Sequence, residues 1–147
     1  MSSIKMEISN KVSMQLEIDE RITFIGGDSG TGKTFIIDAL IDAIKNPDIV
    51  KSEGLILDRV KVCEDEDVVC SIPDIKGNII FLDRYDSYSE KTKELIWKKM
   101  AMKDNTWVLM SRNPDIPENY GFSKKSYKEL ETKEINGKTV IYTVGQN

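Results

Sequence analysis

Three glycines, a lysine and a threonine lie close together in the segment G-D-S-G-T-G-K-T at residues 27–34. Glycine tolerates backbone angles that other residues avoid, so successive backbone N–H groups can point inward at phosphate oxygens. The lysine ammonium can meet the β- and γ-phosphates of a nucleotide, and the threonine hydroxyl can ligate Mg²⁺. A helix that starts after the last glycine adds a partial positive charge. The spacing therefore predicts a phosphate-binding turn.

A second group of candidate residues follows the apolar run Ile-Ile-Phe-Leu at 79–82. Asp83 ends this run, and a magnesium ion bound to phosphates needs a carboxylate of this kind from a neighbouring strand. Arg84 can contact a phosphate or a partner, or it can be an ordinary surface arginine. Asp86 can orient a water molecule, or it can simply begin a turn. The sequence thus predicts a magnesium ligand at Asp83 and leaves both interpretations open for Arg84 and Asp86.

The elements that must position these residues are predicted from hydrophobic periodicity. Residues 21–26 predict a short strand that ends in glycine, and apolar residues at 36, 37, 40, 41 and 44 predict a helix that starts at Lys33. Asn46-Pro47 ends this helix, because proline cannot continue the hydrogen-bond ladder. The glycine-rich segment therefore lies between a strand and a helix, which is the context that supports its interpretation.

Further strands are predicted at 55–62, 79–82 and 106–111. Ser87 with Glu90 three residues later forms a capping box, which predicts a helix over about 87–102. In an open α/β sheet, ligands bind at the carboxyl ends of the strands. Polar residues that follow the predicted strands are therefore expected to meet at one edge of the sheet.

Two hairpins are predicted near the ends of the chain. Apolar residues alternate with polar ones at 4–8 and again at 12–18, and Asn136-Gly137 separates two strand-like segments near the carboxyl terminus. With strands and helices alternating between the hairpins, the predicted fold is α/β. It consists of a mostly parallel sheet with flanking helices, plus antiparallel hairpins near both termini. Residues 1–147 are expected to form one domain.

Composition limits the chemistry that is available. The chain has no histidine, which excludes Ser-His and Cys-His catalytic pairs, and its two cysteines suit neither a disulfide framework nor a usual zinc site. A net charge of −4 argues against an extended nucleic-acid-binding surface. The acidic run at 64–67 is expected to be a solvated loop. Without a signal peptide or a membrane-spanning window in the sequence, a cytoplasmic protein is expected.

The motif at 27–34 and its context resemble the Walker A motif of the P-loop NTPase superfamily, and residues 79–83 resemble its Walker B strand. The resemblance implies ATP and Mg²⁺ as ligands, with Lys33 acting in catalysis and with Thr34 and Asp83 as the metal ligands. It also implies nucleotide contacts along the whole turn, from Gly27, Asp28, Ser29, Gly30, Thr31, Gly32, Lys33 and Thr34. The hairpin that precedes the motif resembles the ABC and RecF-like side of the superfamily.

The segment after Asp83 departs from many related ATPases, which carry a water-orienting glutamate where this chain has Arg84. Asp86 is the substitute candidate. Ser111 and Arg112 stand where related ATPases often place a residue that senses the γ-phosphate. The expected function is ATP binding with slow hydrolysis, in a nucleotide switch or accessory module that acts on a protein partner or a second copy of the chain.

Two alternatives remain open. Asp83-Arg84-Tyr85 followed by Ser87 resembles the DRY segment of thymidylate kinases, which implies a small nucleotide kinase. The other alternative is an ATP-dependent binding or inhibitory module that does not hydrolyse ATP. An assay of ATP turnover with and without nucleoside monophosphates distinguishes these functions.

Overall fold

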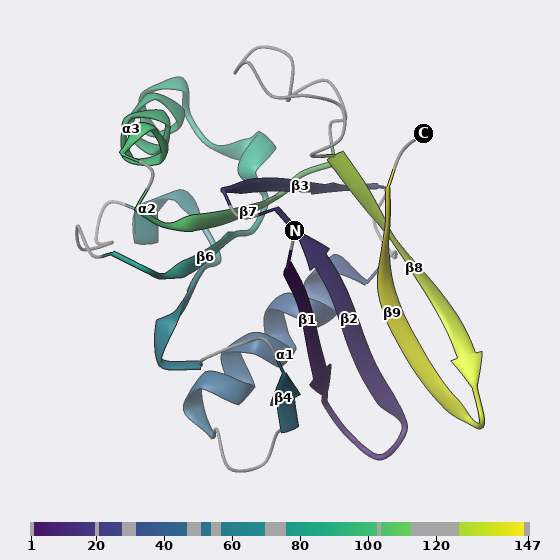
Figure 1. The fold of residues 1–147 in the computed structure, drawn as a ribbon. Helices are drawn as coiled ribbons and strands as arrows, with labels where there is room; N and C mark the ends of the chain where they lie inside the picture. The colour runs from purple at the N-terminus through teal and green to yellow at the C-terminus, as the bar shows by residue number, and fades with distance from the viewer. Residues whose placement is uncertain are drawn as a thin grey trace.

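The computed structural model describes residues 2–19, 21–27, 32–46, 51–53, 57–69, 76–102, 104–112 and 127–145 (Figure 1). The strands are β1 Ser2–Glu7, β2 Val12–Ile18, β3 Ile22–Gly26, β4 Lys51–Glu53, β5 Val60–Cys63, β6 Ile79–Leu82, β7 Thr106–Met110, β8 Tyr127–Ile135 and β9 Lys138–Gly145. The helices are α1 Lys33–Lys45, α2 Glu66–Val69 and α3 Glu90–Ala101, with short 3-10 turns η2 Leu57–Arg59 and η3 Tyr85–Ser87.

The described strands form one sheet in the order β4-β1-β2-β9-β8-β3-β7-β6-β5. The five strands from β8 to β5 are parallel to one another. β8 and β9 are antiparallel, as are β1 and β2, and β4 pairs antiparallel with β1. A parallel pairing of β2 with β9 joins the two halves of the sheet.

This arrangement confirms the α/β class but corrects the predicted architecture. The sheet is mixed, not mostly parallel with flanking helices, and the described part of the chain contains more strand than helix. Both hairpins add their strands to the central sheet, and a hairpin connection makes its two strands antiparallel. The sequence patterns identified the hairpins, but they did not reveal that the hairpins extend the same sheet.

Apolar clusters cover both faces of the parallel half of the sheet, and the first of them extends over β1 and β2. Val108 and Met110 of β7 belong to one apolar cluster, whereas Trp107 and Leu109 belong to a second, because alternate side chains of a strand point to opposite faces. The first cluster includes α1 and the second includes α3. The two helices therefore cover opposite faces of this half, as Figure 1 shows.

The predicted hairpins are confirmed at both ends of the chain. Ile135 pairs with Lys138 across a two-residue turn, in which Asn136 has φ 52° and Gly137 has φ 78°. Two positive φ angles are characteristic of the type I′ turn, whose twist matches that of the flanking strands, and they explain the Asn-Gly sequence. The strand predicted at 21–26 and the helix that ends at Lys45, just before Asn46, are confirmed as well.

Three local predictions are corrected. In the segment 55–62, the described residues 57–59 form η2 and the strand β5 starts only at Val60. The acidic run at 64–67 is not simply a loop, because α2 starts within it. The long helix α3 starts at Glu90 with Ser89 as its cap, so the predicted capping box of Ser87 and Glu90 is wrong.

Within the described ranges, α3 and the other helices are each too short or too polar to span a membrane.

Candidate functional site

The carboxyl ends of four parallel strands lie next to one another at one edge of the sheet. The backbone N–H of Ser111 donates to the carbonyl of Ile25 at 3.0 Å, which joins the end of β7 to the end of β3. The N–H of Asp83 donates to the carbonyl of Cys63 at 2.9 Å, which joins the end of β6 to the end of β5. β6 and β7 are themselves paired through Leu82 and Leu109. The residues that follow β3, β7, β6 and β5 therefore share one edge.

The glycine-rich turn, residues 27–34, leaves β3 at this edge. Asp28, Ser29, Gly30 and Thr31 lie outside the described residues, so the predictions for their nucleotide contacts stay predictions. Gly27 has φ 114° and Gly32 has φ 107°, in the region that favours glycine. The two glycines at the ends of the turn thus have the backbone angles for which the sequence pattern needs them.

Lys33 is folded back across the turn. Its Nζ donates a hydrogen bond to the carbonyl of Gly27, and the residue is half-buried. Gly32 caps α1 without a side-chain hydrogen bond, and the first turn of α1 contains no acidic residue. Because the first N–H groups of a helix have no acceptor within the helix, this end of α1 carries a partial positive charge beside the lysine. The local charges favour an anion.

Thr34 lies on the exposed side of α1, because the burial of Ile36, Ile37 and Leu40 fixes the rotation of the helix. Asp38 is one helical turn further along and is also exposed. Residues four apart lie on the same face of a helix, so Asp38 extends the face that carries the Thr34 hydroxyl.

Asp83 is the buried carboxylate of the edge, with 9% of the residue exposed. Burial raises the pKa of this carboxyl, and the charges of Asp38 and Glu64 raise the pKa further, while the charge and the N–H of Arg84 lower it. A partly dehydrated carboxylate with acidic neighbours gains most from a nearby cation. Asp83 thus has the environment of a cation ligand.

Two protein ligands are enough for such a cation when a nucleotide is present. Magnesium is usually bound by one or two protein oxygens together with substrate phosphates and water. Thr34 and Asp83 match this donor set. No cluster of three or more histidine, cysteine, aspartate or glutamate side chains suited to a metal occurs in the described ranges.

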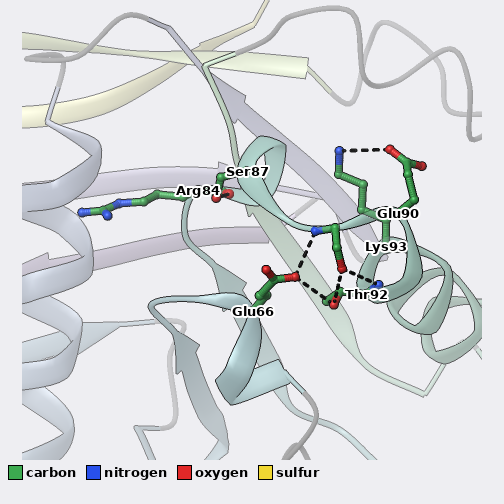
Figure 2. A network of polar contacts seen from close by, with 7 residues as sticks. Glu66, Arg84, Ser87, Glu90, Thr92 and Lys93 are labelled. Atoms are coloured by element: carbon green, nitrogen blue, oxygen red, sulfur yellow. Dashed lines mark hydrogen bonds and ion pairs between the residues drawn. The ribbon is translucent and has the colours of Figure 1, made fainter.

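Arg84 lies directly beyond Asp83, and its backbone has a φ of 54°. Its Nε is 3.9 Å from Oδ2 of Asp83, and its side chain is 73% exposed. Its carbonyl accepts a hydrogen bond from the Ser87 hydroxyl at 2.7 Å, which holds the turn η3 in place. In Figure 2 the Arg84 side chain extends away from the polar network at the start of α3. Arg84 is thus an exposed positive charge beside the buried carboxylate.

The remaining predicted residues lie at the same edge with different exposure. Ser111 is buried between the ends of β3 and β6, whereas Arg112, the next residue, is exposed. Asp86 is half-buried within η3. Among the described residues, no side-chain hydrogen bond or ion pair joins Asp86 or Arg112 to Asp83. Their assigned roles therefore stay predictions.

The sequence patterns missed a polar network between α2 and α3. One carboxylate oxygen of Glu66 accepts hydrogen bonds from the N–H of Ser89 at 2.9 Å and from the hydroxyl of Thr92 at 3.0 Å (Figure 2). The Ser89 hydroxyl oxygen accepts the N–H of Thr92 at 3.3 Å. The repeated serines at 87 and 89 left the start of the helix ambiguous, and nothing in the local sequence pairs Glu66 with a residue 23 positions away.

Asp65 and Cys63 complete the segment after β5. Oδ1 of Asp65 accepts hydrogen bonds from the N–H groups of Asp67 and Val68, which is the pattern of a helix cap for α2. Cys63 is a free, buried cysteine, and burial raises the pKa of its thiol to about 12. This cysteine packs in the second apolar cluster of the core; Cys70 lies outside the described residues.

No protein-family model matches the chain, and no curated protein matches it in sequence.

Proposed function

We propose that the chain is a P-loop protein that binds ATP together with Mg²⁺ at the carboxyl edge of β3, β7 and β6. One observation supports this most directly. Gly27 and Gly32 both have positive φ angles, and Lys33 donates a hydrogen bond to the carbonyl of Gly27, at the same sheet edge as the buried carboxylate Asp83. A glycine-rich turn without a ligand would not explain why the lysine, the threonine and the buried acid occur together.

In this proposal each residue has a distinct task. The N–H groups of the turn and Lys33 hold the phosphates, and the oxygens of Thr34 and Asp83 hold the metal. Bound magnesium would neutralise part of the phosphate charge. Ser111, between the ends of β3 and β6, is the proposed contact near the γ-phosphate, with the exposed Arg112 and Arg84 as further cations near the phosphates.

The proposed activity is slow hydrolysis of ATP in the cytoplasm. The protein would act on a partner protein or on a second copy of the chain, and the bound nucleotide would switch this action. Catalysis of phosphoryl transfer consists mainly of positioning and electrostatic stabilisation. The guanidinium of Arg84 donates hydrogen bonds but accepts none, so it cannot activate water. A partner that contributes another charge to the site would raise the rate.

Thermal unfolding with nucleotide tests the binding site. ATP with Mg²⁺ should stabilise the wild type by about 4 kcal/mol at a ligand concentration about a thousandfold above Kd. Lys33→Ala should lose most of this response, whereas Lys45→Ala, which removes an exposed lysine from the far end of the same helix, should retain it. Identical ATP responses in wild type and Lys33→Ala would contradict the proposal.

Product analysis then separates the activities. Free phosphate from ATP alone indicates an ATPase. Formation of a nucleoside diphosphate from an added monophosphate, thymidine monophosphate in particular, indicates the kinase alternative. ATP-dependent stabilisation without either product indicates a module that only binds the nucleotide.

A further inference from the structure

Glu64 lies beside the proposed magnesium ligand at the sheet edge. β5 and β6 are parallel, and Cys63 pairs with Leu82 as the last residue of each strand. The next residues are Glu64 and Asp83, and the N–H of Asp83 donates to the carbonyl of Cys63 at 2.9 Å. The register therefore brings two carboxylates from neighbouring strands to the same level. This inference rests on the proposed function.

The backbone of Glu64 is held on both sides. Cys63, on the preceding side, is 1% exposed in the core. On the following side, Glu66 is hydrogen bonded to Ser89 and Thr92, which ties the start of α2 to the start of α3 (Figure 2). Because the chain leaves Asp83 through η3 directly into α3, the same helix anchors the segments that carry both carboxylates.

Glu64 and Asp67 are the two acids of this segment whose carboxylates are not used for structure, and of these Glu64 directly follows β5. Asp65 caps α2, and Glu66 accepts the N–H of Ser89, the residue that caps α3. The side chain of Glu64 makes no hydrogen bond or ion pair to any other residue of the described ranges, and the residue is exposed. Its charge is the smallest of the influences that raise the pKa of Asp83, after burial of the carboxyl and the charge of Asp38. A free carboxylate therefore lies close to the metal ligand on the solvent side of the edge.

We propose that Glu64 orients the water molecule that attacks the γ-phosphate of bound ATP. The water oxygen forms a bond to the γ-phosphorus, and the bond between this phosphorus and the β–γ bridging oxygen breaks. ADP leaves with the electron pair of that bond. One proton of the water passes to the Glu64 carboxylate and then to solvent or to the product phosphate. Glu64 thus takes the task for which the position after Asp83, occupied by Arg84, is unsuited.

Glu64→Gln tests this assignment, because it keeps the shape of the side chain and removes its ability to accept a proton. Single-turnover phosphate release with Mg²⁺-ATP should fall by about 10²- to 10⁴-fold. The thermal response to Mg²⁺-ATP should stay at the wild-type level, and the nucleotide extracted from the protein should remain ATP. Glu64→Asp keeps the carboxylate on a shorter side chain. It should release phosphate at a rate between those of the wild type and Glu64→Gln.

Matched variants separate Glu64 from the other acids of this edge. Asp67→Asn removes an exposed charge from the same acidic run and should leave phosphate release unchanged. Asp38→Asn and Asp86→Asn test the rival carboxylates. A wild-type rate in Glu64→Gln, or a wild type that binds ATP without releasing phosphate, would overturn the assignment of Glu64 while leaving ATP binding intact. A wild type without an ATP response would instead overturn the proposed function.

Discussion

Arg84 and Asp83 form an ion pair between a solvated and a buried partner. Nε of Arg84 is 3.9 Å from Oδ2 of Asp83, and the side chains are 73% and 12% exposed. Such a pair contributes little to stability, about 0–1 kcal/mol, because water screens the exposed partner. Its larger effect is on the acid, since the positive charge opposes the rise in the Asp83 pKa that burial causes. The pair therefore keeps a partly dehydrated carboxylate available for a cation.

Asp83→Asn should separate metal binding from nucleotide binding. Because the pKa of Asp83 lies above its ordinary value, ionisation of this acid lowers the free energy of unfolding as the pH rises from about 4 through the raised pKa of the folded protein. We expect the variant without ligand to gain stability relative to wild type over the same pH interval. Titrations with ATP should show a larger loss of affinity in Mg²⁺ than in EDTA. Equal losses under both conditions would make Asp83 a structural strand end.

Arg84→Asn should separate the charge of Arg84 from its backbone conformation. Asparagine tolerates the positive φ of 54° but carries no charge, whereas Arg84→Lys keeps the charge. We expect both variants to melt within a few degrees of wild type, and only Arg84→Asn to bind ATP several-fold more weakly. The defect should shrink with added salt, which screens exposed charges. An unchanged affinity at low ionic strength would identify Arg84 as an ordinary surface arginine.

Glu66→Gln should weaken the link between α2 and α3 in a pH-dependent manner. Hydrogen bonds from the Ser89 N–H, and next from the Thr92 hydroxyl, hold the pKa of Glu66 below its ordinary value of 4.5. A lowered pKa contributes stability that is present above the ordinary value and is lost as the pH falls through the folded value. The variant should therefore melt lower than wild type at pH 7, with a difference that narrows below about pH 4. Asp67→Asn serves as the control, and an equal effect at every pH would contradict the interpretation.

Gly26→Ala should disrupt the end of β3 by a steric clash. A Cβ at this position would lie 1.9 Å from Oη of Tyr127, a residue that is itself 5% exposed in the core. Overpacking of this kind costs about 1–3 kcal/mol. Gly137→Ala is the comparison, because it meets no atom within 4 Å and costs only the strain of its positive φ. Denaturant unfolding measures the free energy of unfolding of both variants. A smaller loss of stability from Gly26→Ala in a Tyr127→Leu background than in the wild type would identify the clash as the cause.

Local sequence patterns determined many of the elements. The Asn136-Gly137 turn, the strand before the glycine-rich turn and the end of α1 at Lys45 depend on neighbouring residues alone, through φ preferences and hydrophobic periodicity. The candidate phosphate residues were proposed from a local pattern as well, because the turn and its flanking elements span one short stretch of chain, and their contacts with a ligand stay a prediction. Gly27 and Gly32 have the positive φ angles that favour glycine.

Tertiary structure decided what depends on residues far apart in the chain. The mixed sheet arises because both hairpins pair with a common set of strands, and hydrophobic alternation does not specify which strand a neighbour will be. Ser89, not Ser87, caps α3: its hydroxyl accepts the N–H of Thr92, and Glu66, on another element, accepts the N–H of Ser89. Glu64 became a candidate only when the register of β5 and β6 brought it beside Asp83. Periodicity and capping report on a few neighbouring residues, whereas the register of parallel strands is set by the packing of the whole sheet.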